Sequence, residues 1–360
     1  MEHKAQTAIL SDEIELIIGN SNSNFSGVTS TMLQVLSQQK SLINLAVMGK
    51  HHLPDPSLFK SFWQVAKMCR TPLKNGKYRI FHARRVDEMI QALMLKHVFG
   101  AKIKIIFSSA AQRKRSGSTK WLTRKMDAVL AMCNASASYL EHPPTKVIYH
   151  GIKSDVYQPA SNKAQAWQSL GFPGEYGIGI LGRVRKQKGV HLFVNACIEN
   201  LKLHPKATAV VVGAISAKEQ AFVDELKAKV AEAGLADRII FTGEQKFEDI
   251  PKIFSALSIV AALSDNEGFG LTIPEAMSCE AAVLATEAGA WPEIIRQGID
   301  GYVVPVNNQQ AVTEKMALMM AEPEKLLAMG KAGRQRVLEN YTVEREALEL
   351  VSFFREIQDK

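Results

Sequence analysis

Residues 258–277 read SIVAALSDNEGFGLTIPEAM, and the pattern of this stretch indicates the fold class. It opens with a run of apolar residues, 258–263, which predicts a buried β-strand. Gly268 and Gly270 follow, and a helical pattern begins directly after them. A strand, a glycine-rich turn and a helix in this order form the unit from which parallel sheets are built.

The same alternation of apolar runs and helical patterns continues in both directions along the chain. The predicted strands are 14–18, 43–48, 79–82, 102–107, 127–132 and 146–149 in the N-terminal half, and 178–182, 208–213, 238–242, 258–263, 282–285 and 301–304 in the C-terminal half. Between the halves, residues 150–176 contain three glycines and two prolines in a polar stretch, which is a linker composition. The sequence therefore predicts an α/β protein with two doubly wound, Rossmann-like parallel-sheet domains.

The predicted N-terminal domain is 1–158 and the predicted C-terminal domain is 159–342. Residues 343–360 are expected to form a C-terminal helix that can pack back on the N-terminal domain.

The composition is that of an ordinary globular protein, with 46% hydrophobic and 22% charged residues in 360, which excludes disordered, collagen-like and coiled-coil chains. The four cysteines lie more than sixty residues apart without a CxxC pair. This spacing argues against a structural zinc site and suits a reducing compartment. Because we find neither a signal peptide nor a run of eighteen apolar residues, we expect a cytoplasmic protein.

Charge is distributed unevenly between the two halves. Residues 1–158 hold 22 Lys and Arg against 10 Asp and Glu, whereas residues 159–360 hold 22 against 26. The basic half is expected to face nucleic acid, an anionic membrane surface or an anionic glycolipid. The alternative is a charge that serves solubility alone.

The loop after strand 258–263 is suited to a sugar phosphate. Gly268 and Gly270 allow the backbone to approach a ligand closely, and the following helix N-terminus offers N–H groups to a phosphate. Glu267 and Glu275 flank the loop, and a carboxylate accepts hydrogen bonds from two hydroxyls at once. The alternative for Thr272 and Glu275 is a capping box, which leaves Glu267 and the glycines unexplained.

A second segment, LGRVRKQKGV at 181–190, holds four cations in six residues between two glycines. Arg183 can bind a diphosphate bidentately and Lys188 adds a point charge, although a solvated basic turn is the alternative. The preceding residues match the dinucleotide fingerprint GxGxxG by letter. Its glycines lie before and within the strand rather than after it, so we reject that match.

The N-terminal half offers less specific candidates. Gly27 follows strand 14–18 and opens a helix, where a phosphate or sugar can meet backbone amides, or where Ser26 acts as an ordinary N-cap. His82 ends strand 79–82, a position where a proton donor is useful, although a lone histidine is more often structural.

A basic loop, Arg113-Lys114-Arg115, follows strand 102–107 and can hold an anionic acceptor. The alternative is a mobile, solvated loop.

Joined together, these motifs resemble the retaining glycosyltransferases of family 4. The resemblance rests on Glu267-Gly-Phe-Gly with Glu275-Ala-Met, and on Gly182-Arg183 with Lys188-Gly189. The junction Tyr149-His150-Gly151-Ile152 and the turn Phe241-Thr242-Gly243 agree with it, so that it covers nearly the whole chain. Gly27-Val-Thr-Ser and His82-Ala-Arg84-Arg85 resemble a subgroup linked to bacterial lipopolysaccharide core assembly.

The resemblance implies the GT-B fold, in which two Rossmann-like domains face each other across a cleft. It implies the retaining transfer of a hexose from a UDP- or GDP-sugar to a lipid-linked saccharide, here in lipopolysaccharide core biosynthesis. The acceptor would be an anionic glycolipid at the cytoplasmic surface of the inner membrane, where the enzyme would act as a peripheral protein. We expect no nucleic acid partner, no cofactor and no catalytic metal, because fixed cations can stabilise the leaving diphosphate.

The resemblance also implies roles for individual residues. Catalytic roles would fall to His82, Arg183, Lys188 and Glu267. Donor-binding roles would fall to Gly27, Gly182, Arg183, Lys188, Gly243, Glu267, Gly268, Phe269, Gly270, Leu271, Thr272 and Glu275, with Glu275 on the ribose and Glu267 on the sugar ring. Acceptor binding would fall to Arg84, Arg85, Arg113, Lys114 and Arg115.

Two departures from the family pattern stand in the N-terminal half. Arg84 replaces the second histidine of an H-x-H motif, and His150 replaces the junction asparagine. The alternatives are a GT-B epimerase or phosphorylase, of which the phosphorylase needs a pyridoxal lysine, and a non-catalytic sugar-binding protein of the periplasm. The missing export signal and the cation cluster argue against the last of these.

Overall fold

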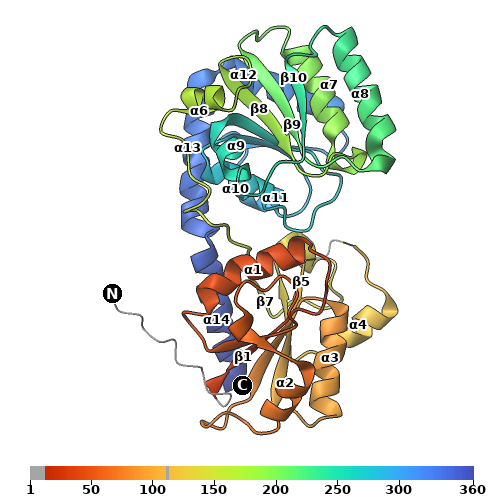
Figure 1. The fold of residues 1–360 in the computed structure, drawn as a ribbon, viewed down its shortest axis with the longest axis vertical. Coiled ribbons are helices and arrows are strands. Elements are labelled where there is room, and N and C mark those ends of the chain that lie inside the picture. Colours follow the sequence, from red (N-terminus) through yellow and green to blue (C-terminus); the bar gives the residue numbers. More distant parts are fainter. Residues whose placement is uncertain (1–12, 111–112) are drawn as a thin grey trace. The chain divides into compact units, whose positions relative to one another are not determined.

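The computed structural model describes residues 13–110 and 113–360. The chain forms two compact units, one from the residues up to Gly151 together with Val343–Lys360, and one from Ile152–Thr342 (Figure 1). The sequence places the first boundary at 158, seven residues later. Ile152 already belongs to the second unit because its N–H donates to the Tyr341 carbonyl at 2.9 Å and it forms a parallel bridge with Thr342.

The first unit is built on a parallel sheet in the order β3-β2-β1-β4-β5-β6-β7. Its strands are β1 (Leu16–Gly19), β2 (Leu45–Met48), β3 (Phe59–Lys60), β4 (Arg79–Ala83), β5 (Ile103–Ser109), β6 (Ala128–Ala131) and β7 (Lys146–Val147). Its helices are α1 (Gly27–Gln39), α2 (Phe62–Met68), α3 (Val86–His97), α4 (Gly117–Thr123), α5 (Asn134–Ala137) and α14 (Val343–Asp359), with a 3₁₀ turn at Pro56–Leu58.

The second unit is built on a parallel sheet in the order β10-β9-β8-β11-β12-β13. Its strands are β8 (Tyr176–Leu181), β9 (Ala207–Val212), β10 (Ile239–Gly243), β11 (Leu257–Ala262), β12 (Ala282–Thr286) and β13 (Gly301–Val304). Its helices are α6 (Lys163–Ser169), α7 (Val190–Asn200), α8 (Gln220–Glu232), α9 (Ile250–Ala256), α10 (Thr272–Ser278), α11 (Trp291–Ile294), α12 (Gln309–Ala321) and α13 (Pro323–Asn340), with 3₁₀ turns at Lys186–Lys188 and Ala217–Glu219.

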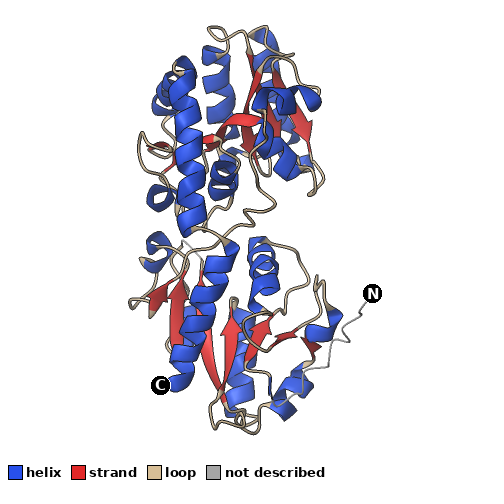
Figure 2. Cartoon of the chain, turned by 90° about the vertical axis from the view of Figure 1, so that its left-hand side faces the viewer, coloured by secondary structure: helices blue, strands red, loops and turns tan. Residues whose placement is uncertain are grey.

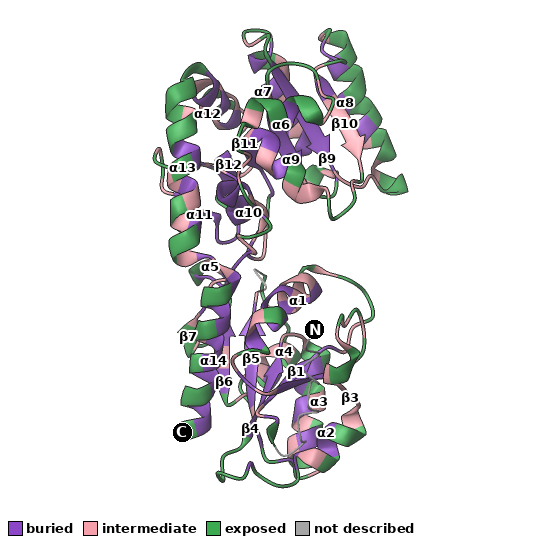
Figure 3. Ribbon diagram, turned by 60° about the vertical axis from the view of Figure 1, so that its left-hand side comes forward, coloured by how far each residue is buried: buried purple, intermediate pink, exposed green. Residues whose placement is uncertain are grey.

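In each unit helices lie on both sides of the strands (Figure 2). The strands are the most buried elements and the exposed residues lie mainly on helices and loops (Figure 3). The predicted α/β class with two doubly wound parallel sheets is therefore confirmed.

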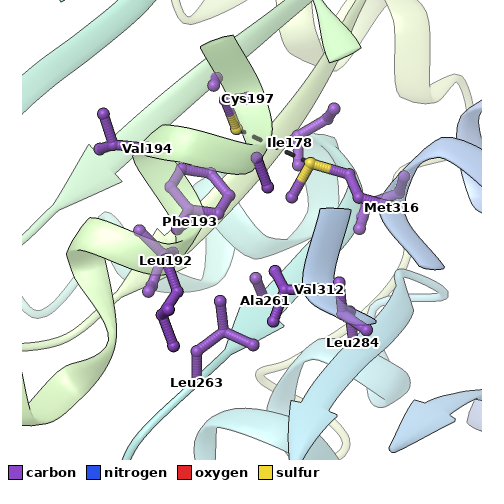
Figure 4. Close-up of a cluster of buried hydrophobic side chains, with 14 of the residues drawn as sticks. Ile178, Leu192, Phe193, Val194, Cys197, Ala261, Leu263, Leu284, Val312 and Met316 are labelled. Atoms are coloured by element: carbon purple, nitrogen blue, oxygen red, sulfur yellow. Dashed lines mark hydrogen bonds between the residues drawn. The ribbon is translucent and has the colours of Figure 1, made fainter. Parts of the chain in front are cut away.

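The core of the second unit shows why the sheet carries helices on its faces. Phe193 of α7, Ile178 of β8 and Val312 of α12 are fully buried in one apolar cluster (Figure 4). Cys197 lies in the same cluster, 3.9 Å from the Met316 sulfur, and burial raises the pKa of its thiol. All four cysteines are buried, and none of them is in a disulfide.

The strand order reverses direction at one place in each sheet, between β1 and β4 and between β8 and β11. In open parallel sheets the loops that leave the carboxyl ends of the strands at such a point form the ligand site. The loops in question are 20–26 and 84–85 in the first unit, and 182–189 and 263–271 in the second. Most of the residues that the sequence predicts to bind a ligand lie in or next to these loops.

Candidate functional site

Two loops of the second unit pack tightly against each other at its switch point. They follow β8 and β11, which are paired strands. Gly189 has a φ of +70°, and a Cβ atom there would lie 2.1 Å from the Leu263 carbonyl oxygen. The Asp265 N–H donates to the Gln187 carbonyl at 3.0 Å and the Gln187 side chain donates to the Asn266 carbonyl at 3.1 Å. The two candidate motifs thus form one surface.

Lys188 and Glu267 are paired directly across these loops. The Lys188 Nζ lies 2.5 Å from Glu267 Oε2, and the two side chains are 24% and 22% exposed. The Ser264 hydroxyl also donates to this oxygen, at 3.4 Å. The cation and the carboxylate are therefore both within reach of a ligand, and each neutralises the other.

Arg183 lies in the same loop and is exposed. Its guanidinium has no hydrogen-bond or ion-pair partner within the described parts of the chain. Its five N–H donors are therefore available to an anion.

The glycine loop 268–271 is fixed by Trp291. The Trp291 indole N–H donates to the Gly270 carbonyl at 2.9 Å, and the Ala290 N–H donates to the Phe269 carbonyl at 3.2 Å. Gly270 has a φ of +83°, and a Cβ atom there would lie 2.2 Å from the indole nitrogen. The loop can therefore take this course only with glycine at 270.

The capping-box alternative for this loop is wrong. Helix α10 has Leu271 at its N-cap and Thr272 at its first helical position, and no side chain of the described residues caps it. Glu275 instead accepts a hydrogen bond from the Tyr157 hydroxyl. Burial raises the pKa of Glu275 to about 7, an effect that this hydrogen bond opposes. The carboxylate is thus poised between its two protonation states near neutral pH.

Gly182 follows β8 and Gly243 ends β10, the two strands that flank β9. The Gly213 N–H donates to the Gly243 carbonyl at 2.9 Å, and Gly182 has a φ of +134°. A Cβ atom at Gly213 would lie 1.9 Å from the Gly182 carbonyl oxygen. Backbone therefore lies against backbone along this edge of the sheet.

In the first unit His82 lies at the end of β4 and is 1% exposed. Its Nε2 is 2.6 Å from the Ser108 hydroxyl, its Nδ1 has no partner within the described residues, and its ring packs edge-on against Phe354. Burial, with the charges of Arg84 and His150, holds the pKa of this imidazole well below its usual range. His82 is therefore a neutral, buried side chain in this structure.

Arg84 and Arg85 are positioned differently. Arg85 donates to the hydroxyls of Ser26 and Thr29, both at 2.9 Å, so it is already bound to the start of α1. The Arg84 guanidinium has no hydrogen-bond partner among the described residues, and its Nη1 is buried. Burial lowers the pKa of Arg84, while the carboxylates of Glu88 and Glu346 act against this.

Glu88 is the third residue of α3, the helix that follows these arginines. Its Oε2 accepts from the backbone N–H groups of Arg84 and Arg85, at 2.7 and 3.2 Å. Glu88 packs against Gly19, where a Cβ atom would lie 2.9 Å from the carboxyl carbon. Glycine at the end of β1 is therefore needed to admit this carboxylate.

Of the remaining residues predicted for a site in the first unit, Arg115 already has partners within the described chain. Gly27 is the first residue of α1, and a Cβ atom there would meet nothing within 4 Å. Ser26 makes no capping hydrogen bond through its side chain. Arg113 and Lys114 are exposed, whereas the Arg115 guanidinium donates to the Ser109 hydroxyl and lies 5.1 Å from the Phe107 ring centroid.

His150 is bound to the C-terminal helix, a contact that the sequence analysis does not predict. Its Nδ1 lies 2.7 Å from Glu346 Oε1, and the Gly151 N–H donates to Glu346 Oε2 at 2.8 Å. Both side chains are buried. Glu346 therefore ties the end of the first unit's chain to α14.

Three further residues of the site carry no local signal in the sequence. They are Tyr157, Ser264 and Trp291, none of which is among the residues predicted for the site. Each reaches a predicted residue through the fold: Glu275, Glu267 and Gly270 respectively.

No cluster of three or more His, Cys, Asp or Glu side chains that could hold a metal ion is found in the described part of the chain. None of the helices in residues 13–110 and 113–360 is long and apolar enough to span a membrane.

Comparison with known proteins shows to which family the chain is similar. The model of the "Glycosyl transferases group 1" family matches residues 162–336. The lipopolysaccharide core biosynthesis mannosyltransferase LpcC of Rhizobium leguminosarum bv. viciae is 42% identical, and the match covers 93% of this chain and 94% of that protein. The lipopolysaccharide core biosynthesis mannosyltransferase LpsB of Rhizobium meliloti (strain 1021) is 37% identical, with 96% and 98% covered.

A solved structure shares the fold over nearly the full length. The Anabaena protein Alr3699/HepE, crystallised with UDP, superposes with a TM-score of 0.81 at 18% identity, and covers 95% of this chain and 100% of that one. The expected likeness to GT-B glycosyltransferases is thereby confirmed at the level of the fold.

Proposed function

The chain belongs to the group 1 glycosyl transferases and is a glycosyltransferase, and from this premise we propose that it transfers a hexose from a UDP- or GDP-linked sugar to a lipid-linked saccharide with retention of configuration. The donor half of this proposal rests on one observation at the switch point of the second unit. The loop after β8 carries Lys188, the loop after β11 carries Glu267, and these two side chains form an ion pair.

The donor diphosphate would bind Arg183 and Lys188. Arg183 is exposed and unpartnered within the described chain, and its planar fork matches two phosphate oxygens. Lys188 is partly exposed, and its present partner is a carboxylate that an anionic ligand can replace. The N–H groups around Phe269 to Thr272 would bind sugar and phosphate oxygens.

The two carboxylates of the loop would read hydroxyl groups. Glu275 would accept from both hydroxyls of the ribose, and Glu267 would accept from hydroxyls of the donor sugar once Lys188 has turned to the diphosphate. These assignments follow the family pattern, and the partial exposure of both side chains supports them.

In the reaction the bond between the sugar C1 and the diphosphate oxygen breaks, and a bond forms between C1 and an acceptor hydroxyl oxygen on the same face. The hydroxyl proton leaves with the nucleoside diphosphate, which takes the electron pair of the broken bond. Arg183 and Lys188 would stabilise the charge that develops on this leaving group. We propose that they do so without a catalytic metal or any other cofactor.

The acceptor half of the proposal rests on the first unit. The Arg84 guanidinium has no hydrogen-bond partner among the described residues, and its Nη1 is buried. Arg113 and Lys114, which directly precede Arg115, are exposed. Such a set of donors suits an anionic saccharide. His82 would act there as a neutral hydrogen-bonding group or positioning residue for the acceptor, since its Nδ1 is unpaired among the described residues.

The names of the relatives make the substrate more specific. Both Rhizobium proteins are named mannosyltransferases of lipopolysaccharide core biosynthesis, and they match nearly the full chain. We therefore propose mannose as the hexose, the lipopolysaccharide core as the product, and a peripheral position at the cytoplasmic face of the inner membrane. The comparisons do not favour an epimerase, a phosphorylase or a sugar-binding protein.

A transfer assay in the presence of EDTA tests this proposal. The donors would be UDP- and GDP-linked hexoses, the acceptor a truncated lipopolysaccharide, and the anomeric configuration of the product would be read by NMR. We expect transfer with retention, a loss of rate in Arg183→Ala and Glu275→Ala, and a nearly unchanged rate in Lys186→Ala, an exposed cation of the same loop. An inverted product, or a wild-type rate in Arg183→Ala, would contradict the proposal.

A further inference from the structure

Tyr157 is a buried tyrosine of the second unit whose surroundings fix its side chain. It is 4% exposed, and its ring packs edge-on against Phe254 of α9, with the ring centroids 5.8 Å apart. Its N–H donates to the Lys153 carbonyl at 2.9 Å. Because the ring and the backbone are both held, the hydroxyl at the end of the ring has a fixed position.

The backbone of Tyr157 is bound to helix α10, which carries Glu275 and lies beside α9 and α13 (Figure 1). The Ser278 hydroxyl donates to the Tyr157 carbonyl at 2.6 Å. The Arg334 guanidinium of α13 donates to the Ser278 carbonyl and, at 3.5 Å, to the Tyr157 carbonyl. Ser278 follows Glu275 by three residues, so the two lie on the same side of α10. The tyrosine is therefore anchored on the side of the helix that carries the carboxylate.

The Tyr157 hydroxyl donates to this carboxylate. In the described part of the chain no cation pairs with Glu275, and the phenol is its only hydrogen-bond partner. A hydrogen bond to the ionised form favours that form, and here it opposes the effect of burial on the pKa of Glu275. One hydroxyl group thus determines how the carboxylate is oriented.

We propose that Tyr157 is a positioning residue for the nucleotide, whose hydroxyl holds the Glu275 carboxylate in the orientation that receives the two ribose hydroxyls. An ionised carboxylate accepts about four hydrogen bonds, so after one from the phenol it can still accept one from each hydroxyl of the diol. Because Tyr157 is buried, it acts through Glu275 rather than on the ligand. This inference rests on the proposed function, in which Glu275 binds the ribose, and adds the residue that orients it.

Calorimetric titration with the nucleoside diphosphate that the wild type binds, UDP or GDP, and with its 2′-deoxy analogue tests this role. We expect the wild type to bind the ribonucleotide about tenfold more tightly than the analogue, as one hydrogen bond to a charged group predicts. Tyr157→Phe keeps the ring and removes the hydroxyl, so this preference should fall to about threefold or less while affinity for the analogue changes little. In the transfer assay the KM for the sugar nucleotide should rise several-fold with kcat nearly unchanged.

Further variants separate the orientation of Glu275 from a general loss of structure. Tyr176→Phe removes the hydroxyl of a partly buried tyrosine at the start of β8, the end of the strand away from the ligand loops, and should keep the preference. In Glu275→Gln the preference should already be small, and adding Tyr157→Phe should lower it no further, because both changes remove one interaction. If Tyr157→Phe does not fold, Ser278→Ala, which frees the Tyr157 carbonyl, should lower the preference in the same direction.

The outcomes distinguish this inference from the proposed function. A wild-type preference that persists in Tyr157→Phe, or an equal loss of affinity for both nucleotides, overturns the positioning role and leaves the proposed function standing. Equal binding of both nucleotides by the wild type removes the ribose contact of Glu275, and the inference with it, but keeps the diphosphate site. Failure of the wild type to bind any nucleoside diphosphate contradicts the proposed function itself.

Discussion

The ion pair between Lys188 and Glu267 has a consequence for nucleotide affinity. A diphosphate that binds Lys188 must compete with the Glu267 carboxylate 2.5 Å away. Glu267→Gln removes the competing charge, so free UDP or GDP should bind several-fold more tightly, corresponding to about 1 kcal/mol. Transfer should fall, since the amide replaces the proposed acceptor of sugar hydroxyls.

Titration calorimetry with the nucleoside diphosphate measures the first effect. Asp265→Asn is the matched control, because it removes an exposed carboxylate two residues away and should change affinity little. Weaker nucleotide binding in Glu267→Gln than in the wild type would contradict the role given to this pair.

The raised pKa of Glu275 predicts a dependence on pH. The folded state raises this pKa from 4.5 to about 7, so it binds the proton more tightly than the unfolded state does. The free energy of unfolding should therefore fall as pH rises from about 4.5 to 7. Ribose binding needs the ionised form, so nucleotide affinity should rise over the same range and level off above pH 7.

Parallel titrations of the wild type and Glu275→Gln at several pH values check this. The amide variant should keep only the pH dependence that belongs to the nucleotide's own phosphate. Equal slopes in the two proteins would show that Glu275 does not titrate in this range or does not contact the ligand.

At the scale of elements, the packing of the β8 and β11 loops depends on Gly189. Gly189 and Gly234 both have a φ of +70°, but a Cβ atom meets the Leu263 backbone at 2.1 Å at the first and nothing within 4 Å at the second. Gly234→Ala should therefore cost only the left-handed strain of about 1–2 kcal/mol. Gly189→Ala should cost about 1–3 kcal/mol more and should weaken nucleotide binding.

Denaturant unfolding and nucleotide titration of both variants give the comparison. Only Gly189→Ala should lose affinity for the nucleotide. If both variants lose the same stability and neither loses affinity, the loops are not held together by this contact.

Elements of the sheets could be predicted from the sequence because each strand is a short apolar run between turns. The exception is β3, Phe59–Lys60, which pairs one aromatic residue with a lysine and is not part of an apolar run. The site loops were found because glycines and charges stand at fixed distances from strand ends, which is local information.

Partners distant in the sequence could not be predicted in this way. His150 and Glu346 are 196 residues apart, and Trp291 and Gly270 are 21 apart with no shared motif. Their contacts follow from the whole fold. The untested assignments, among them every role in catalysis, stay predictions for the same reason: no local pattern fixes what a ligand contacts.

At the scale of the whole molecule, the chain leaves the first unit after Gly151 and returns to it at Val343. Glu346 binds both His150 and Gly151 just before the exit, and it is 4% exposed. Glu346→Ala removes one partner of a buried pair and should destabilise the first unit by about 3–5 kcal/mol. Glu344→Ala, an exposed change two residues earlier, should stay within about 0.5 kcal/mol.

Denaturant unfolding monitored by circular dichroism measures both variants. If Glu346→Ala unfolds at the same denaturant concentration as Glu344→Ala, the contacts of Glu346 with His150 and Gly151 contribute little to the stability of the first unit.

Calorimetric titration of UDP and GDP in EDTA tests whether Arg183 and Lys188 form a diphosphate site that needs no metal. The wild type should bind one of the two nucleotides, and Arg183→Ala should bind it about tenfold to a hundredfold more weakly, as expected for a lost charge-assisted hydrogen bond. Lys186→Ala should bind like the wild type. Absence of binding by the wild type, or equal affinity in Arg183→Ala, would contradict the claim.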